Sequence, residues 1–129
     1  MKKLRVVNTV MFLNLSNHSY ETWSENQKNA AKEHGEIVDY PFPAVDPMAT
    51  KQEIEQLAEN VVREVVDLTP KIIMCQGEFT LTYRLVKMLQ EAGFLVVSAC
   101  SERNTTIIQR EDGSTVKQIG FEFQQFREY

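Results

Sequence analysis

Residues 71–84 read KIIMCQGEFTLTYR and contain the transition that decides the fold. An apolar run stops at the polar sequence QGE, residues 76–78, and a helical pattern begins at Thr80. This order predicts a buried strand, a tight turn and a helix N-terminus, which is where open α/β sheets place their ligands. Gly77 permits a positive φ or a close ligand approach, and Thr80 or Thr82 is the expected cap of a helix whose free amides favour anions. Taken alone, the segment fits a plain polar connection between two packed elements better.

The composition of the 129-residue chain is that of one ordinary globular domain, with 43% hydrophobic and 25% charged residues. The formal charge of -4 argues against binding of duplex nucleic acid through a basic surface, although a few amides and basic groups can hold a small nucleotide. No apolar run approaches the roughly 18 residues of a membrane span, and the sequence MKKLRVV lacks a signal-peptide core. With Cys75 and Cys100 expected as reduced, buried thiols, we expect a cytoplasmic protein with no membrane partner.

The first half of the chain predicts two strands around one helix. Residues 10–15, VMFLNL, form a compact apolar run typical of a central strand, and residues 1–10 are either an extension or part of a longer first strand. A helix is expected to start around residues 19–21 and to run to about His34, where Gly35 stops it.

A second strand and a long helix follow. Residues 36–40 form the expected strand, and a proline-rich connection after it cannot be helical. Thr50 and Glu53 match a capping box. The apolar spacing over residues 54–66 then predicts an amphipathic helix that Pro70 ends.

The last third of the chain predicts a strand and a hairpin. Residues 94–99, FLVVSA, are apolar on both faces and end at a polar segment, residues 100–105. Asp112-Gly113 is a strong hairpin signal between strands at residues 106–110 and 115–126.

These elements predict a single α/β domain over residues 1–129. We expect a small Rossmann-like open sheet, mostly parallel, in the order 2-1-3-4 with a C-terminal antiparallel hairpin. In that order the ends of the first and third strands flank the topological switch point, and the end of the fourth lies beside them. Segments 14–18, 76–80 and 101–105 are therefore expected to converge on one cleft.

The expected cleft holds few chemical groups. His18 could exchange protons near neutral pH, and Arg103 could stabilise charge on a phosphate. Each has a structural alternative, because His18 could cap or pack, Arg103 could pair with Glu102 or Glu78 on the surface, and Glu78 could only cap a helix. A thiol nucleophile at Cys75 is disfavoured, and no motif for a nucleotide loop or a metal site is present.

Four motifs together resemble a known protein class. LNLSNH at residues 13–18, QGEFTLTY at 76–83, SERN at 101–104 before the DG hairpin, and FQQFREY at 123–129 resemble small standalone CRISPR-associated proteins. These are the CARF-like, ring-nuclease type found beside type III systems, which serve antiviral defence. The likeness spans residues 11–129.

The resemblance implies a Rossmann-like (CARF-like) homodimer that binds a cyclic oligoadenylate, most of all cyclic tetra-adenylate, across its two-fold axis. Some members cleave the ring without metal or cofactor, since the ribose 2′-hydroxyl attacks the adjacent phosphate and leaves a 2′,3′-cyclic phosphate. Two alternatives stay open: a non-catalytic sensor or sponge of the same fold, and a structural α/β interaction domain.

Carried onto this sequence, the resemblance implies three catalytic candidates: His18 for proton transfer, Arg103 for phosphate stabilisation, and Glu78. The implied ligand-binding residues are polar groups of the same three segments, namely Asn14, Ser16, Asn17, Gln76, Gly77, Thr80, Ser101 and Asn104. No metal ligand is implied. Arg103 is the only basic side chain in the three segments, which is little positive charge for a ligand with four or six phosphates. A dimer would supply two copies of Arg103, and Arg84 and Lys87 could add further positive charge.

Overall fold

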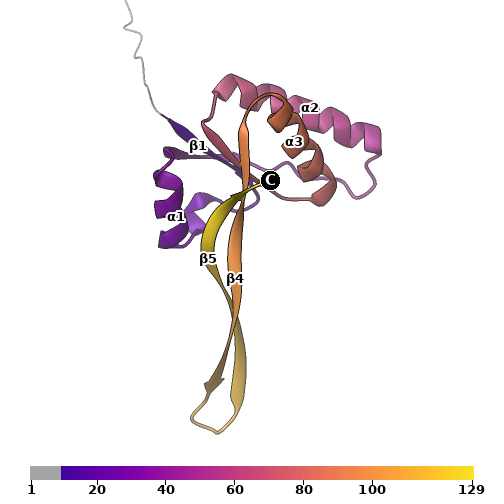
Figure 1. Cartoon of the computed structure of the whole chain (residues 1–129). Helices are drawn as coiled ribbons and strands as arrows, with labels where there is room; N and C mark the ends of the chain where they lie inside the picture. The colour runs from indigo at the N-terminus through magenta and orange to yellow at the C-terminus, as the bar shows by residue number, and fades with distance from the viewer. Residues whose placement is uncertain (1–9) are drawn as a thin grey trace, which may run out of the picture.

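The computed structural model describes residues 10–129 and shows a five-stranded sheet with helices on both faces (Figure 1). The elements are β1 (Met11–Ser16), the short 3₁₀ helix η1 (Tyr20–Thr22), α1 (Glu25–Lys32), β2 (Glu36–Pro41), α2 (Lys51–Leu68), β3 (Ile72–Gln76), α3 (Phe79–Glu91), β4 (Leu95–Gln109) and β5 (Thr115–Glu128). The strand order is β2-β1-β3-β4-β5, parallel except for the antiparallel pair β4–β5. The predicted fold class and strand order are confirmed. The question of an N-terminal extension falls on residues 1–9, outside the described part.

Side chains alternate between the two faces of the sheet and build two cores. Phe12 and Met74 point to the face covered by α1, where Trp23 packs with them. Leu13 and Cys75 point to the other face, which α2 and α3 cover. Asn14 and Ser16 follow Phe12 at spacing two along β1, so this alternation places them on the α1 face. No helix within residues 10–129 is long and apolar enough to cross a membrane.

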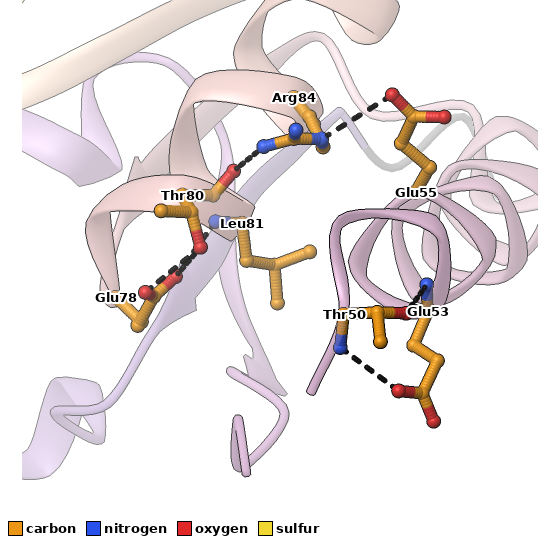
Figure 2. A network of polar contacts seen from close by, with 7 residues as sticks. All are labelled: Thr50, Glu53, Glu55, Glu78, Thr80, Leu81 and Arg84. Atoms are coloured by element: carbon orange, nitrogen blue, oxygen red, sulfur yellow. Dashed lines mark hydrogen bonds and ion pairs between the residues drawn. The ribbon is translucent and has the colours of Figure 1, made fainter. Parts of the chain in front are cut away.

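The helix N-termini agree with the sequence in one case and differ in another (Figure 2). Thr50 and Glu53 form the predicted capping box at the start of α2. α3, however, begins at Phe79 and is capped by Glu78, so the prediction of Thr80 or Thr82 as cap was wrong. The flexible Glu78 side chain folds back so that its carboxylate accepts from the Leu81 amide at 2.7 Å, and this brings the helix start forward.

The start of α1 also differs from the prediction. The chain near residues 19–21 makes only η1, and α1 begins at Glu25 with Ser24 as its cap. Between them Trp23 is extended, with φ -73° and ψ 155°, because its ring packs edge-on against Phe12 at a centroid distance of 6.1 Å. Tertiary packing of one aromatic side chain thus overrides the local helical signal.

The largest difference concerns β4. Residues 100–105 are not a polar strand end, since β4 continues through them to Gln109 and pairs with β5 along its length. Pairing of β3 with β4 stops at Met74 and Val97, so beyond this point β4 and β5 form a two-stranded ribbon that leaves the body of the molecule (Figure 1). We call residues 101–123 the arm. Asp112-Gly113 lies at its turn, as predicted.

Candidate functional site

The end of β1 holds the loop that carries His18. The Asn14 side chain is 1% exposed, and its Nδ2 donates to the His18 carbonyl oxygen at 2.8 Å. The Ser16 hydroxyl lies 2.6 Å from Asn14 Oδ1, and Trp23 Nε1 donates to the same His18 carbonyl at 3.3 Å. Asn14 and Ser16 therefore fix the backbone of His18, while the imidazole itself is on an exposed residue.

Asp39 on β2 completes this network, and the sequence did not point to it. Its Oδ1 accepts from Asn14 Nδ2 at 2.8 Å and from the Tyr20 amide at 3.1 Å, and its Oδ2 accepts from the Ser19 hydroxyl at 3.0 Å. β1 and β2 pair Asn14 with Asp39 directly, so their contact follows from the sheet register. The carboxylate thus ties β2 to the loop after β1.

The gap between β3 and β4 is bridged by a side chain. Oε1 of Gln76, the last residue of β3, accepts a hydrogen bond from the Ala99 amide of β4. Since regular pairing ends two residues earlier, at Met74, this contact replaces a backbone bond where the strands diverge. The divergence leaves room for a cavity beside the strand ends.

That cavity has a volume of about 810 Å³ and opens on the α1 side of the sheet. Its lining is Ser16, His18, Thr22, Trp23, Ser24, Gln27, Met74, Gln76, Ala99, Ser101, Phe121 and Phe123. Four of the predicted site residues meet here, one or two from each predicted segment: Ser16, His18, Gln76 and Ser101. Within residues 10–129 the lining carries no Asp, Glu, Lys or Arg, so it offers hydroxyls, amides, one imidazole and aromatic rings.

A second hollow of about 320 Å³ lies on the β2 side of the same loop. It contains Asn14 and Asn17 together with Asp39 and Phe42. Ser16 lines both hollows, so the loop after β1 separates them.

The turn after β3 lies outside the cavity lining. The predicted close approach to Gly77 is made by the chain itself, since a Cβ there would lie 2.6 Å from the Phe42 ring. Glu78 accepts hydrogen bonds from the Leu81 amide and the Thr80 hydroxyl, and these bonds lower the pKa of its carboxyl group (Figure 2). A carboxylate held ionised in a helix cap is a poor proton donor, and Gly77, Glu78 and Thr80 do not line the cavity.

The convergence predicted for the SERN segment was wrong beyond Ser101. Arg103 and Asn104 lie on the arm, because β4 continues as a strand and carries them away from the other strand ends. Asn104 Nδ2 donates to Glu122 Oε2 at 3.3 Å. Arg103 is not part of the cavity lining, but it is paired across the ribbon with Phe121, which is.

The remaining candidates for charge and reactivity are placed elsewhere. Arg84 connects α3 to α2, with Nε 3.8 Å from Glu55 Oε1 and a terminal nitrogen donating to the Thr80 carbonyl (Figure 2). Burial raises the pKa of the Cys75 thiol to about 12, which removes its nucleophilic form at neutral pH. Among residues 10–129 no group of three His, Cys, Asp or Glu side chains is arranged to hold a metal ion.

Comparison with known proteins identifies the family of the chain. No curated protein and no solved structure matches the chain. The model of the family described as "Uncharacterized protein MJ1673 family" matches residues 10–127, and the chain therefore belongs to that family.

Proposed function

We propose that the protein binds a cyclic oligoadenylate, cyclic tetra-adenylate first, and opens it as a metal-independent ring nuclease. The observation that carries the proposal is the cavity at the ends of β1 and β3, where the fixed loop of His18 meets hydroxyls, amides and aromatic rings. An uncharged polar and aromatic lining suits adenine and ribose, and within residues 10–129 no acidic side chain in it repels a phosphate. The order of the four sequence motifs supports the same substrate.

The chemistry follows from His18 and its surroundings. The imidazole accepts the proton of a ribose 2′-hydroxyl while the 2′-oxygen attacks the adjacent phosphorus in line. The bond from phosphorus to the 5′-oxygen breaks, and that oxygen takes a proton from solvent. The products are a linear oligoadenylate with a 2′,3′-cyclic phosphate at one end and a 5′-hydroxyl at the other. Arg103, the cross-strand partner of the lining residue Phe121, stabilises charge on the non-bridging oxygens.

Asn14, Ser16 and Asp39 are positioning residues in this proposal. Their hydrogen bonds hold the His18 backbone and leave the imidazole free to meet the ligand. A loop that is already fixed loses less conformational entropy when the ligand binds. The Glu78 carboxylate keeps its capping role and takes no part in the chemistry.

The proposal includes a homodimer. Within residues 10–129, one subunit offers the guanidinium of Arg103 beside the lining residue Phe121, whereas a two-fold axis through a cyclic ligand would supply two and match its symmetry. A monomer by light scattering at micromolar concentration, with and without the ring, would contradict this part.

A sensor or sponge is the second candidate, and one observation favours it. Within the described part of the chain, no hydrogen bond orients the His18 imidazole, whereas catalytic histidines usually have an orienting partner. Binding without turnover needs no such partner.

The test is to incubate the protein with cyclic tri-, tetra- and hexa-adenylate, with and without EDTA, and to resolve products by chromatography with mass detection. Chelator-resistant conversion to linear oligoadenylate ending in a cyclic phosphate supports the nuclease. His18→Ala should abolish turnover and keep part of the binding, while His34→Gln is the matched control because His34 is not part of the cavity lining.

A thermal shift on the same samples separates the other outcomes. An intact ring with a raised melting temperature identifies a sensor or sponge, since a ligand that binds only the folded state stabilises it. An intact ring without a shift in melting temperature would favour the remaining alternative, a structural α/β interaction domain.

A further inference from the structure

The two faces of the arm differ in chemistry. Directly opposed residues of an antiparallel pair share a face, and successive residues alternate. One face, which we call the aromatic face, therefore carries the pairs Ser101–Phe123, Arg103–Phe121, Thr105–Ile119 and Ile107–Lys117. The other face carries the pairs Glu102–Glu122, Asn104–Gly120, Thr106–Gln118 and Ile108–Val116.

Charge is segregated between these faces. Within residues 101–108 and 116–123, the charged side chains of the aromatic face are Arg103 and Lys117, and those of the other face are Glu102 and Glu122. The two glutamates oppose each other directly, an arrangement that costs stability in a strand pair. Over these two paired stretches the carboxylates are thus kept off the aromatic face, which suits a polyanion.

The aromatic face continues the cavity. Phe123 is 9% exposed and Phe121 is 73% exposed, yet both line the same cavity. A large ring left open at a cavity rim, opposite the guanidinium of Arg103, is the kind of surface on which nucleobases stack.

The spacing of the cations fits several nucleotides. Arg103 and Ile107, the partner of Lys117, are four residues apart on β4, or about 13 Å along a strand. Stacked nucleotides rise by about 3.4 Å each, so this length corresponds to about four of them.

We propose that the aromatic face binds single-stranded oligoadenylate that the cavity leaves uncovered, with a base stacked on Phe121 and phosphates held by Arg103 and Lys117. The inference rests on the proposed function for the identity of the nucleotide, but it does not require cleavage. The lining of the cavity, within residues 10–129, has no cation. The aromatic face supplies Phe121 as a surface for a base, and it supplies Lys117 as a cation in addition to Arg103.

A second copy of the chain is the other occupant to consider. Ile107 and Ile119 are exposed on the same face and would suit a protein surface. The separation of cations from carboxylates favours the polyanion, because an apolar interface does not require that separation and two chains of net charge -4 repel each other.

The experiment measures fluorescence anisotropy of labelled linear oligoadenylates of two and eight nucleotides over a salt series, with the full chain. Phe121→Ala should weaken binding of the longer strand by about tenfold, and of the shorter strand by less. Removing both cations, Arg103→Gln with Lys117→Gln, should reduce the slope of log K against log salt by about 1.4, since each single-strand phosphate contact contributes about 0.7. Ile108→Ala and Gln118→Ala, on the opposite face of the same arm, are the matched controls.

Equal affinity of wild type and Phe121→Ala for the longer strand would overturn the inference. So would a change in oligomeric state of Phe121→Ala by light scattering with nucleotide affinity unchanged, which would make the arm a subunit interface. Binding of the linear strand that depends on Phe121, with every cyclic ring neither bound nor cut, would leave the arm inference standing and remove the proposed function. Cleavage of a ring by the wild type, with binding of the linear strands unchanged in both arm variants, would leave the proposed function standing and remove the arm inference.

Discussion

The hydroxyl of Tyr129 donates a 2.6 Å hydrogen bond to the carbonyl oxygen of Cys75, which joins the last residue of the chain to β3. Backbone pairing of β3 with β4 has already ended at Met74. Tyr129 is further held by the bond from its amide to the Val96 carbonyl oxygen. Gln76 connects the diverging strands β3 and β4 through its bond with the Ala99 amide, and Tyr129 connects the same two strands through Cys75 and Val96. The terminal FREY sequence therefore has a structural role next to the site.

Removing this hydroxyl should weaken the fold. Tyr129→Phe leaves the Cys75 carbonyl without its donor, and we expect a loss of about 1 kcal/mol in the free energy of unfolding, measured by urea denaturation at pH 7. Tyr83→Phe is the control, because Tyr83 is exposed on α3. A loss that is equal for both variants would contradict the role given to the Tyr129 bond.

The same bond should depend on pH in a defined direction. Burial raises the pKa of Tyr129 above its ordinary value of 10.0, so the fold favours the protonated phenol. The added stability is fully present below the unfolded-state pKa and is lost as the pH rises towards the folded-state pKa. The difference in stability between wild type and Tyr129→Phe should therefore shrink above pH 10, as followed by urea denaturation across that range.

The Glu78 cap should show the opposite pH dependence. Glu78→Ala should cost about 1 kcal/mol at pH 7, because the Leu81 amide loses its acceptor. The Leu81 and Thr80 bonds lower the pKa of Glu78, so its contribution is present above the unfolded-state pKa and is lost as the pH falls through the folded-state pKa. Wild type and Glu78→Ala should thus converge in stability in acid. A difference that stays constant as the pH is lowered through the acid range would argue against the charged cap.

The parts of the fold that could be predicted are those that depend on local sequence, either on the pattern of apolar residues that become buried or on neighbouring residues at a helix start. Residues 72–75 are buried on both faces, and the capping box at Thr50 uses only its own neighbours, so local sequence was enough for both. The strand order followed from the parallel crossovers.

The missed features depend on contacts across the sheet. The arm contributes little to the core, so residues 101–105 read as a polar loop although they pair regularly with β5. Asp39 contacts Asn14 because the two residues are paired between β2 and β1. They are far apart in the sequence, so this pairing could not be predicted from local sequence. In the sequence Phe121 was only one apolar position of an alternating strand. Its place in the cavity lining depends on the pairing of β5 with β4, in which Phe121 lies opposite Arg103.

The Cys75 thiol should be inert in the native protein. Burial raises its pKa to about 12, whereas Cys100 is half-buried near the base of the arm. Thiol titration with a disulfide reagent at pH 8 should modify Cys100 first and Cys75 only after denaturant is added. Cys75→Ala should keep any ring-opening activity, and loss of that activity in a folded Cys75→Ala protein would restore the thiol as a candidate nucleophile.

Asp39 should act on ligand binding through the loop that it holds. Asp39→Ala removes the acceptor of Asn14 Nδ2, the Ser19 hydroxyl and the Tyr20 amide, so the His18 loop should loosen and the thermal shift with cyclic tetra-adenylate should fall. Asp39→Asn retains one acceptor oxygen and should restore much of that shift, which a purely electrostatic role of the carboxylate would not allow. Asp46→Ala, an exposed acidic residue outside both hollows, is the control for lost charge. If Asp39→Ala and Asp46→Ala reduce the shift equally, Asp39 does not position the site, and the fixed His18 loop loses its main support in the proposed chemistry.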